Sequence, residues 1–148
     1  MTGAIVVSTY HSEITDQLQR DAIEAWTAAG GDRNDLQIVA VPGAFELPVI
    51  CATIARATPR VDVIVALGCV IKGETTHDQH INAAVAAGLS GIAVETSIPV
   101  GFGLLTCASH DEARARCDGT KGRKGAEAMN AAITTAQVIK AMTPEHVS

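Results

Sequence analysis

Residues 61–68 read VDVIVALG, a nearly continuous apolar run that ends at a glycine. Such a run is typical of a parallel strand that is buried on both faces of its sheet. Residues 69–77, CVIKGETTH, then bring a lysine, a second glycine, hydroxyl groups and a histidine. Because ligands bind outside the carboxyl ends of strands in open α/β sheets, this junction predicts a ligand site at the end of a central strand.

Strands and helices alternate on both sides of this run. Further strands are expected at residues 4–7, 36–41 and 99–106, and the helical spacing of Ile14, Leu18 and Trp26 predicts a first helix. More helices are expected at residues 46–57, around Ile81, Val85 and Leu89, after a capping box at residues 109–112, and at residues 126–142. This alternation implies right-handed crossovers. The expected α/β fold is a three-layer, doubly wound, flavodoxin-like sheet of four parallel strands in the order 2-1-3-4, with helices on both faces.

Composition narrows the class of protein. The chain has 148 residues, so we expect a single domain over residues 1–148. Its net charge is −5, and its cations are scattered apart from Lys121, Arg123 and Lys124, so a nucleic-acid partner is not expected. Hydrophobic residues make up 47% and charged residues only 18%, which leaves apolar surface for contacts between subunits.

The cysteines indicate the compartment. The chain has four cysteines without CxxC spacing, and it begins without a basic, apolar signal segment. We therefore expect reduced thiols in a cytoplasmic protein. No apolar run approaches the roughly 20 residues that span a bilayer, so no membrane association is expected.

The polar loop at residues 72–77 lacks the nucleotide-binding patterns GxxxxGK[ST] and GxGxxG. Backbone amides after Gly73, at the start of a helix, could hold a phosphate, and His77 could transfer protons near neutral pH. The alternative is an ordinary strand-to-helix turn with His77 as a surface or capping side chain, and the spacing leaves both open. A metal site of His77, Asp78 and His80 is less favoured, because no further ligand cluster accompanies it.

Two other segments carry candidate binding residues. After the strand at residues 36–41, Phe45 and Glu46 offer a ring and an acceptor to a flat heterocycle that bears hydroxyls. The alternative is a helix start, with Phe45 in the core and Glu46 complementing the helix dipole. Residues 99–103 place Phe102 between glycines, and residues 114–124 carry five cations. An arginine there could bind phosphate, or the segment could be a solvated helix end.

Taken together, these segments resemble the lumazine synthase family. The resemblance runs from Ile5 to Met142. It is carried by residues 41–48, by residues 66–68 with 73–77, by Pro99 with residues 102–103, and by residues 119–121 with 124–127. Lumazine synthases join 5-amino-6-ribitylaminouracil to 3,4-dihydroxy-2-butanone 4-phosphate, which gives 6,7-dimethyl-8-ribityllumazine in riboflavin biosynthesis. The resemblance implies a transferase that needs no metal and no organic cofactor.

The resemblance also implies a set of site residues. His77 matches the proton-transfer histidine of the family. Stacking or polar contacts to the pyrimidine and ribityl chain are implied for Tyr10, Ala44, Phe45, Glu46, Cys69, Val70 and Ile71. Contacts to the phosphate are implied for Glu74, Thr75 and Arg116. Residues that reach the site from an adjoining subunit are matched by Phe102, Arg116 and Lys124.

Assembly and activity are further expectations. The resemblance implies a pentamer and, as a partner, riboflavin synthase. Larger shells are left open, because only three residues precede the first strand, whereas the short connection at residues 119–125 is that of shell-forming members. The chain departs from the family pattern at Tyr10, His11, Lys72, Asp78, His80 and Ala115. The departures at Asp78, His80 and Ala115 keep open a non-catalytic flavin or lumazine carrier, or a structural shell protein, of the same fold. A flavodoxin-like electron carrier is the third, least favoured class.

Overall fold

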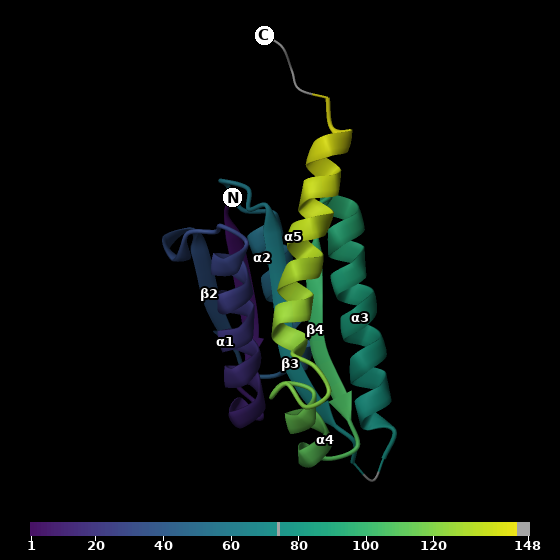
Figure 1. Cartoon of the computed structure of the whole chain (residues 1–148). Coiled ribbons are helices and arrows are strands. Elements are labelled where there is room, and N and C mark those ends of the chain that lie inside the picture. Colours follow the sequence, from purple (N-terminus) through teal and green to yellow (C-terminus); the bar gives the residue numbers. More distant parts are fainter. Residues whose placement is uncertain (74, 145–148) are drawn as a thin grey trace.

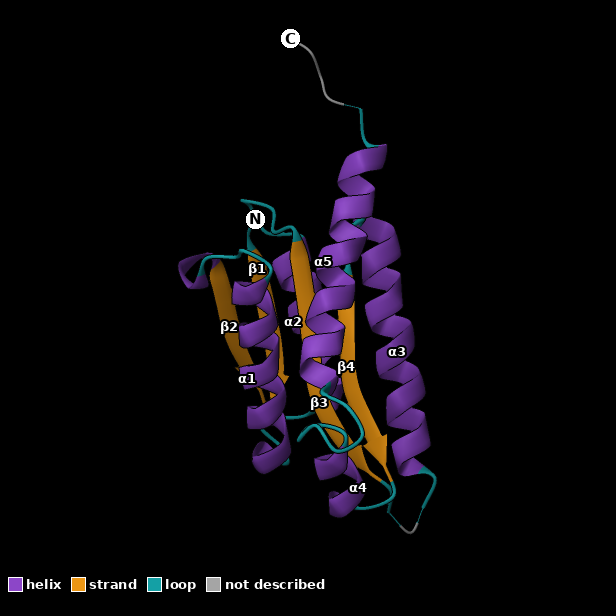
Figure 2. Ribbon diagram, in the orientation of Figure 1, coloured by secondary structure: helices purple, strands orange, loops and turns teal. Residues whose placement is uncertain are grey.

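A parallel sheet of four strands forms the middle layer of the computed structural model, which describes residues 1–73 and 75–144. The strands are β1 (Gly3–Ser8), β2 (Leu36–Val41), β3 (Val63–Ile71) and β4 (Val100–Cys107). They pair in the order β2-β1-β3-β4, and every pairing is parallel, as Figure 2 shows. The predicted α/β fold and strand order are confirmed.

Helices cover both faces of this sheet (Figure 1). One face carries α1 (Ser12–Ala28) and α5 (Lys124–Met142), and the other carries α2 (Leu47–Ala55) and α3 (His77–Thr96). The short helix α4 (His110–Ala115) and two 3-10 turns, η1 (Arg33–Asp35) and η2 (Ala44–Glu46), complete the fold. None of the helices in the described ranges is long and apolar enough to cross a membrane.

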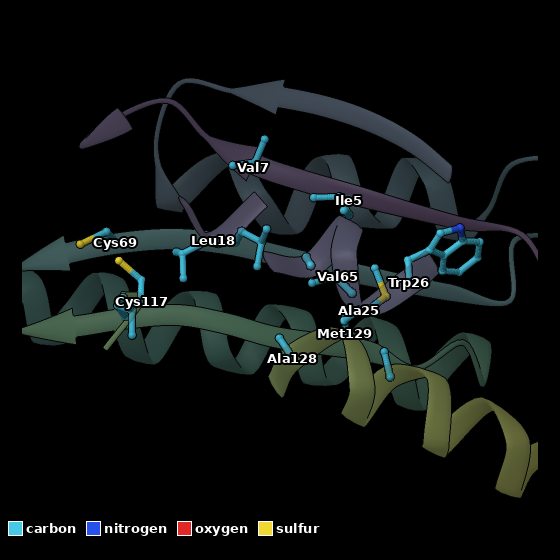
Figure 3. Close-up of a cluster of buried hydrophobic side chains, with 14 of the residues drawn as sticks. Ile5, Val7, Leu18, Ala25, Trp26, Val65, Cys69, Cys117, Ala128 and Met129 are labelled. Atoms are coloured by element: carbon cyan, nitrogen blue, oxygen red, sulfur yellow. The ribbon is translucent and has the colours of Figure 1, made fainter. Parts of the chain in front are cut away.

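The sheet is apolar on both faces, so the core has two halves. Successive residues of a strand point to opposite faces. Ile5 and Val65 therefore join the half beneath α1 and α5, whereas Val6 and Ile64 join the half beneath α2 and α3. Figure 3 shows the first half, with Trp26 at one end and Cys69 and Cys117 at the other. This double burial is what the run at residues 61–68 predicted.

The element boundaries differ from the sequence pattern in one place that matters for the site. Strand β3 continues to Ile71, three residues past the glycine expected to end it, because its pairing with β4 continues to the Ile71–Cys107 pair. Its pairing with β1 already ends at Val7 and Leu67. The last residues of β3 therefore have a strand on one side only.

A capping arrangement fixes the start of α4. The Ser109 hydroxyl accepts a hydrogen bond of 3.1 Å from the Glu112 amide, as the predicted capping box requires. The Glu112 carboxylate accepts a bond of 2.8 Å from the Ala108 amide, one residue before the cap. The predicted box is thus present with its second bond shifted by one residue, and it holds α4 against the end of β4.

All four cysteines are free and buried. Burial raises the pKa of the Cys51 thiol from 9.0 to about 12, because the thiolate would be desolvated in the core. Burial likewise raises the pKa of Cys69 to about 12. The thiols that the sequence predicted to be reduced are therefore also expected to be unreactive at neutral pH.

The raised thiol pKa values predict a loss of stability in alkali. Between pH 9 and about 12 the unfolded chain releases the Cys51 proton whereas the folded chain keeps it, so stability falls as pH rises. Each such thiol contributes about 1.4 kcal/mol per pH unit in this window. Urea unfolding at several pH values should give a shallower decline for Cys51→Ala than for the parent chain. Parallel declines would contradict the prediction.

Candidate functional site

A cavity of about 570 Å³ opens at the carboxyl ends of β1, β2 and β3. This volume lies within the usual range of ligand sites, roughly 300–1,000 Å³. The strand order reverses between β1 and β3, which is where doubly wound sheets bind ligands. The end of β3, the segments that follow β1, β2 and β3, and the start of α3 supply the lining: Tyr10, His11, Gly43, Ala44, Phe45, Glu46, Cys69, Val70, Ile71, Gly73, Thr75, His77, Asp78 and Ile81.

The structure brings most of the predicted site residues into this cavity. Those that line it are Tyr10, Ala44, Phe45, Glu46, Cys69, Val70, Ile71, Thr75 and His77. Glu74 lies outside the described residues. A larger hollow of about 640 Å³ at the other end of the sheet is lined by none of the predicted residues. We therefore place the candidate site at the carboxyl end.

Two aromatic rings face the opening of the cavity. Tyr10 is 66% exposed, and Phe45, which lies on η2, is 65% exposed. The alternative of Phe45 as a core residue is therefore wrong. Between them the rings provide flat apolar surfaces for a heterocycle, and the half-buried Glu46 adds a carboxylate beside Phe45.

His77 is the first residue of α3 and is exposed to the cavity. Its amide donates a hydrogen bond of 3.2 Å to the Thr75 hydroxyl, which orders the turn before the helix. The second histidine of this turn has a different environment, because Nε2 of His80 lies 3.4 Å from the Thr76 hydroxyl and His80 does not line the cavity. Of the two histidines, His77 is placed for chemistry in the cavity.

Asp78 lies next to His77 in the chain but is buried, whereas His77 is exposed. Consecutive helical residues differ by about 100° around the helix axis, so their side chains diverge. Asp78 is only 7% exposed and lines the same cavity as His77. Within the described residues, its Oδ1 has no hydrogen-bond partner. A buried acceptor therefore faces the cavity beside the exposed imidazole.

Three predicted residues lie outside the cavity of this single chain. Phe102 and Lys124 line a separate hollow of about 420 Å³ between β4 and α5. Arg116 forms an ion pair of 3.6 Å with Glu112 on α4. The resemblance assigned these three residues to the site of an adjoining subunit, and that assignment stays a prediction.

The cationic segment at residues 114–124 is partly structural. Arg123 pairs at 3.3 Å with Asp21, a nearly buried residue of α1, and so ties the start of α5 to α1. Arg114 pairs at 3.6 Å with Asp111 within α4. Part of the segment is thus used to fix the packing of helices, a role that neither interpretation of the sequence included.

Sequence reasoning did not identify His11, Gly43, Gly73, Asp78 and Ile81 as lining residues. The first four flank predicted residues, so extending each predicted segment by one position would have found them, whereas Ile81 lies one helical turn after His77. The structure also brings His11, Glu13 and His110 together, the only group of three potential metal ligands in the described part of the chain. Nothing in the sequence indicated this group, because α1 and α4 meet only through the fold. The triplet His77, Asp78 and His80 forms no such group.

Comparisons with known proteins identify the family of the chain. A family model described as 6,7-dimethyl-8-ribityllumazine synthase matches residues 1–140. A protein of that name from Corynebacterium kroppenstedtii is 46% identical over 144 residues, which cover 96% of this chain and 87% of the relative. 6,7-Dimethyl-8-ribityllumazine synthase 1 of Caulobacter vibrioides is 42% identical over 93% of this chain and 89% of its own length. The Thermus thermophilus protein is 39% identical over 95% and 88%. The chain therefore belongs to the 6,7-dimethyl-8-ribityllumazine synthase family.

Proposed function

We propose that this protein is a 6,7-dimethyl-8-ribityllumazine synthase, a transferase of riboflavin biosynthesis that acts as a single domain over residues 1–148. The observation that carries the proposal is the cavity in which Phe45, Glu46 and His77 meet at the end of β3. Membership of the family supplies the reaction, in which 5-amino-6-ribitylaminouracil condenses with 3,4-dihydroxy-2-butanone 4-phosphate.

The pyrimidine is proposed to bind between the aromatic rings and the free edge of β3. Beyond Leu67 the main chain of β3 has no partner from β1, although it stays paired with β4. The amides and carbonyls of residues 69–71 on that side border the cavity and suit the edge of a heterocycle. Tyr10 and Phe45 then stack on the ring, and Glu46 accepts hydrogen bonds from ribityl hydroxyls.

The phosphate is proposed to bind at the start of α3. Amides of the first helical turn and the helix dipole favour an anion there, and Gly73 permits close approach of the backbone. The Thr75 hydroxyl stands at the same turn. Arg116 of an adjoining copy adds a guanidinium, and Glu74 belongs to the same proposed set of phosphate ligands.

His77 is proposed to move protons during imine formation, loss of phosphate and ring closure. These steps need positioned proton transfer more than a strong nucleophile. Asp78 offers its unpartnered oxygen to an N–H or O–H group of the bound substrate, because a buried acceptor is costly until it is paired.

The site is proposed to be completed by a second copy of the chain, in a pentamer. Phe102 is 42% exposed, and Val94 and Val138 are exposed at 80% and 51%, so apolar surface is available for contact. Phe102 and Lys124 of one copy would then face the cavity of the next. Larger shells and contact with riboflavin synthase are further proposals. The four free thiols support a cytoplasmic enzyme.

Incubating the purified protein with both substrates and following the fluorescence of the lumazine product tests this proposal. We expect product to form well above the uncatalysed rate. A chain that binds ribityl ligands yet yields no product above that background would be a carrier or shell protein instead. A tightly bound, coloured flavin with no turnover would point to an electron carrier.

A further inference from the structure

A second cluster of histidine and carboxylate side chains lies at the rim of the cavity, where the starts of α1 and α4 meet. His11 precedes α1, Glu13 is in its first turn, and His110 begins α4. One donor atom from each residue lies within 4.8 Å of the other two. Nδ1 of His110 is 3.1 Å from Oε1 of Glu13, and the rings of His11 and His110 meet edge to face at 4.9 Å between centroids.

This spacing suits a metal ion. Two donors that each lie about 2.0–2.2 Å from one zinc ion at a tetrahedral angle are roughly 3.3–3.6 Å apart. The Glu13–His110 pair is already near that separation, and the His11 donor lies within 4.8 Å of both. Two imidazoles and one carboxylate are a ligand set that zinc accepts, with a fourth position left for water.

Hydrogen bonds of the fold hold the backbone at two of these three residues. The His11 carbonyl accepts bonds of 2.9 and 3.1 Å from the amides of Ile14 and Thr15, so the backbone of His11 is fixed at the start of α1. The Ser109 cap fixes the backbone beside His110. Preorganised ligands lose less conformational entropy on binding an ion.

The charge around the cluster also permits a cation. The nearby arginines of α4 have carboxylate partners, since Arg114 pairs with Asp111 and Arg116 pairs with Glu112. Glu13 is half exposed, so an ion can reach it from solvent.

We propose that His11, Glu13 and His110 form a binding site for a divalent transition-metal ion, with zinc as the best fit. Because His11 also lines the cavity, an ion held there is thermodynamically linked to whatever occupies the cavity. The site is proposed as a binding site at the rim and takes no part in the proton transfers assigned to His77.

Titration calorimetry with zinc, on the assembled full chain at neutral pH, tests the site without any measurement of turnover. We expect one ion per chain with a Kd on the order of 1–10 μM. His110→Ala and Glu13→Gln should each weaken binding more than about tenfold, because loss of a ligand costs at least as much as loss of the hydrogen bonds that support one. His80→Ala, which removes an exposed histidine outside the cluster, should bind zinc as the parent chain does.

Cobalt as a spectroscopic substitute identifies the ligands. We expect visible bands of cobalt with nitrogen and oxygen ligands in the parent chain and in His80→Ala, and their loss in His110→Ala. Circular dichroism verifies that the variants remain folded. An intense thiolate-to-cobalt band, zinc affinity that survives in both His110→Ala and Glu13→Gln, or no binding by the parent chain at about 100 times the expected Kd overturns the proposal.

Discussion

Replacing His77 with alanine is expected to lower the turnover number by roughly 100- to 10,000-fold, the usual contribution of a positioned acid–base group. The exposed imidazole lines the cavity at the start of α3, whereas the neighbouring Asp78, which also lines it, is buried. The affinity for the ribityl substrate should change little, because the proposed ring contacts come from Tyr10 and Phe45. Steady-state kinetics and fluorescence binding measure the two effects separately.

His80→Ala is the matched control for this variant. His80 stands one turn along the same helix and lies near the Thr76 hydroxyl, outside the cavity, so its removal should leave turnover near that of the parent chain. Equal turnover of His77→Ala and the parent chain, with assembly intact, would remove His77 from the proposed mechanism. Loss of binding together with turnover would assign His77 to substrate binding instead.

Replacing Gly125 with alanine is expected to destabilise the chain by roughly 2–3 kcal/mol, at the upper end of the usual cost of overpacking. Gly125 lies in the first turn of α5, where the backbones of α5 and α1 approach closely. A Cβ at this position would overlap the carbonyl oxygen of Leu18. Because the obstacle is backbone and not the end of a flexible side chain, the two helices must move apart to admit the methyl group.

Gly91→Ala is the control for this variant, because it is expected to stabilise the chain. Gly91 is exposed within α3, and a Cβ there would meet no other atom within 4 Å. Alanine should therefore stabilise the helix by roughly 0.5–1 kcal/mol. Urea unfolding at one fixed chain concentration compares both variants with the parent chain, because self-association makes stability depend on concentration. A Gly125→Ala variant as stable as Gly91→Ala would show that the helix pair adapts at no cost.

Gly125 also shows why a sequence resemblance and a physical explanation are different things. Residues 124–127 are one of the segments that carry the resemblance, and the sequence suggested only that Lys124 could reach a substrate. The structure adds a packing reason for the glycine, since α1 and α5 cover the same face of the sheet at close range (Figure 1). Arg123 has a packing reason too, through its pair with Asp21.

Much of the site was accessible from the sequence because strand ends are local features. An apolar run followed by a polar loop marks the carboxyl end of a buried strand, and parallel strands place all such ends at one edge of the sheet. This argument predicts from the sequence alone that Phe45 and His77 lie at the same edge of the sheet. Extension of β3 to Ile71 was not accessible, because it depends on pairing with β4 and not on the residues of β3 alone.

The sequence by itself determined the α/β class, the order of elements and the family, since alternating apolar periods and motif spacing are encoded locally. The tertiary structure alone decided which side chains share a space. It buried Asp78 and left His77 exposed in the same cavity, separated His80 from that cavity, and left Phe102 and Lys124 at another hollow. It also joined His11 and Glu13 to His110 at the rim. Such contacts depend on crossover geometry and on close packing between segments that are distant in the chain, and no local pattern in the sequence predicts them.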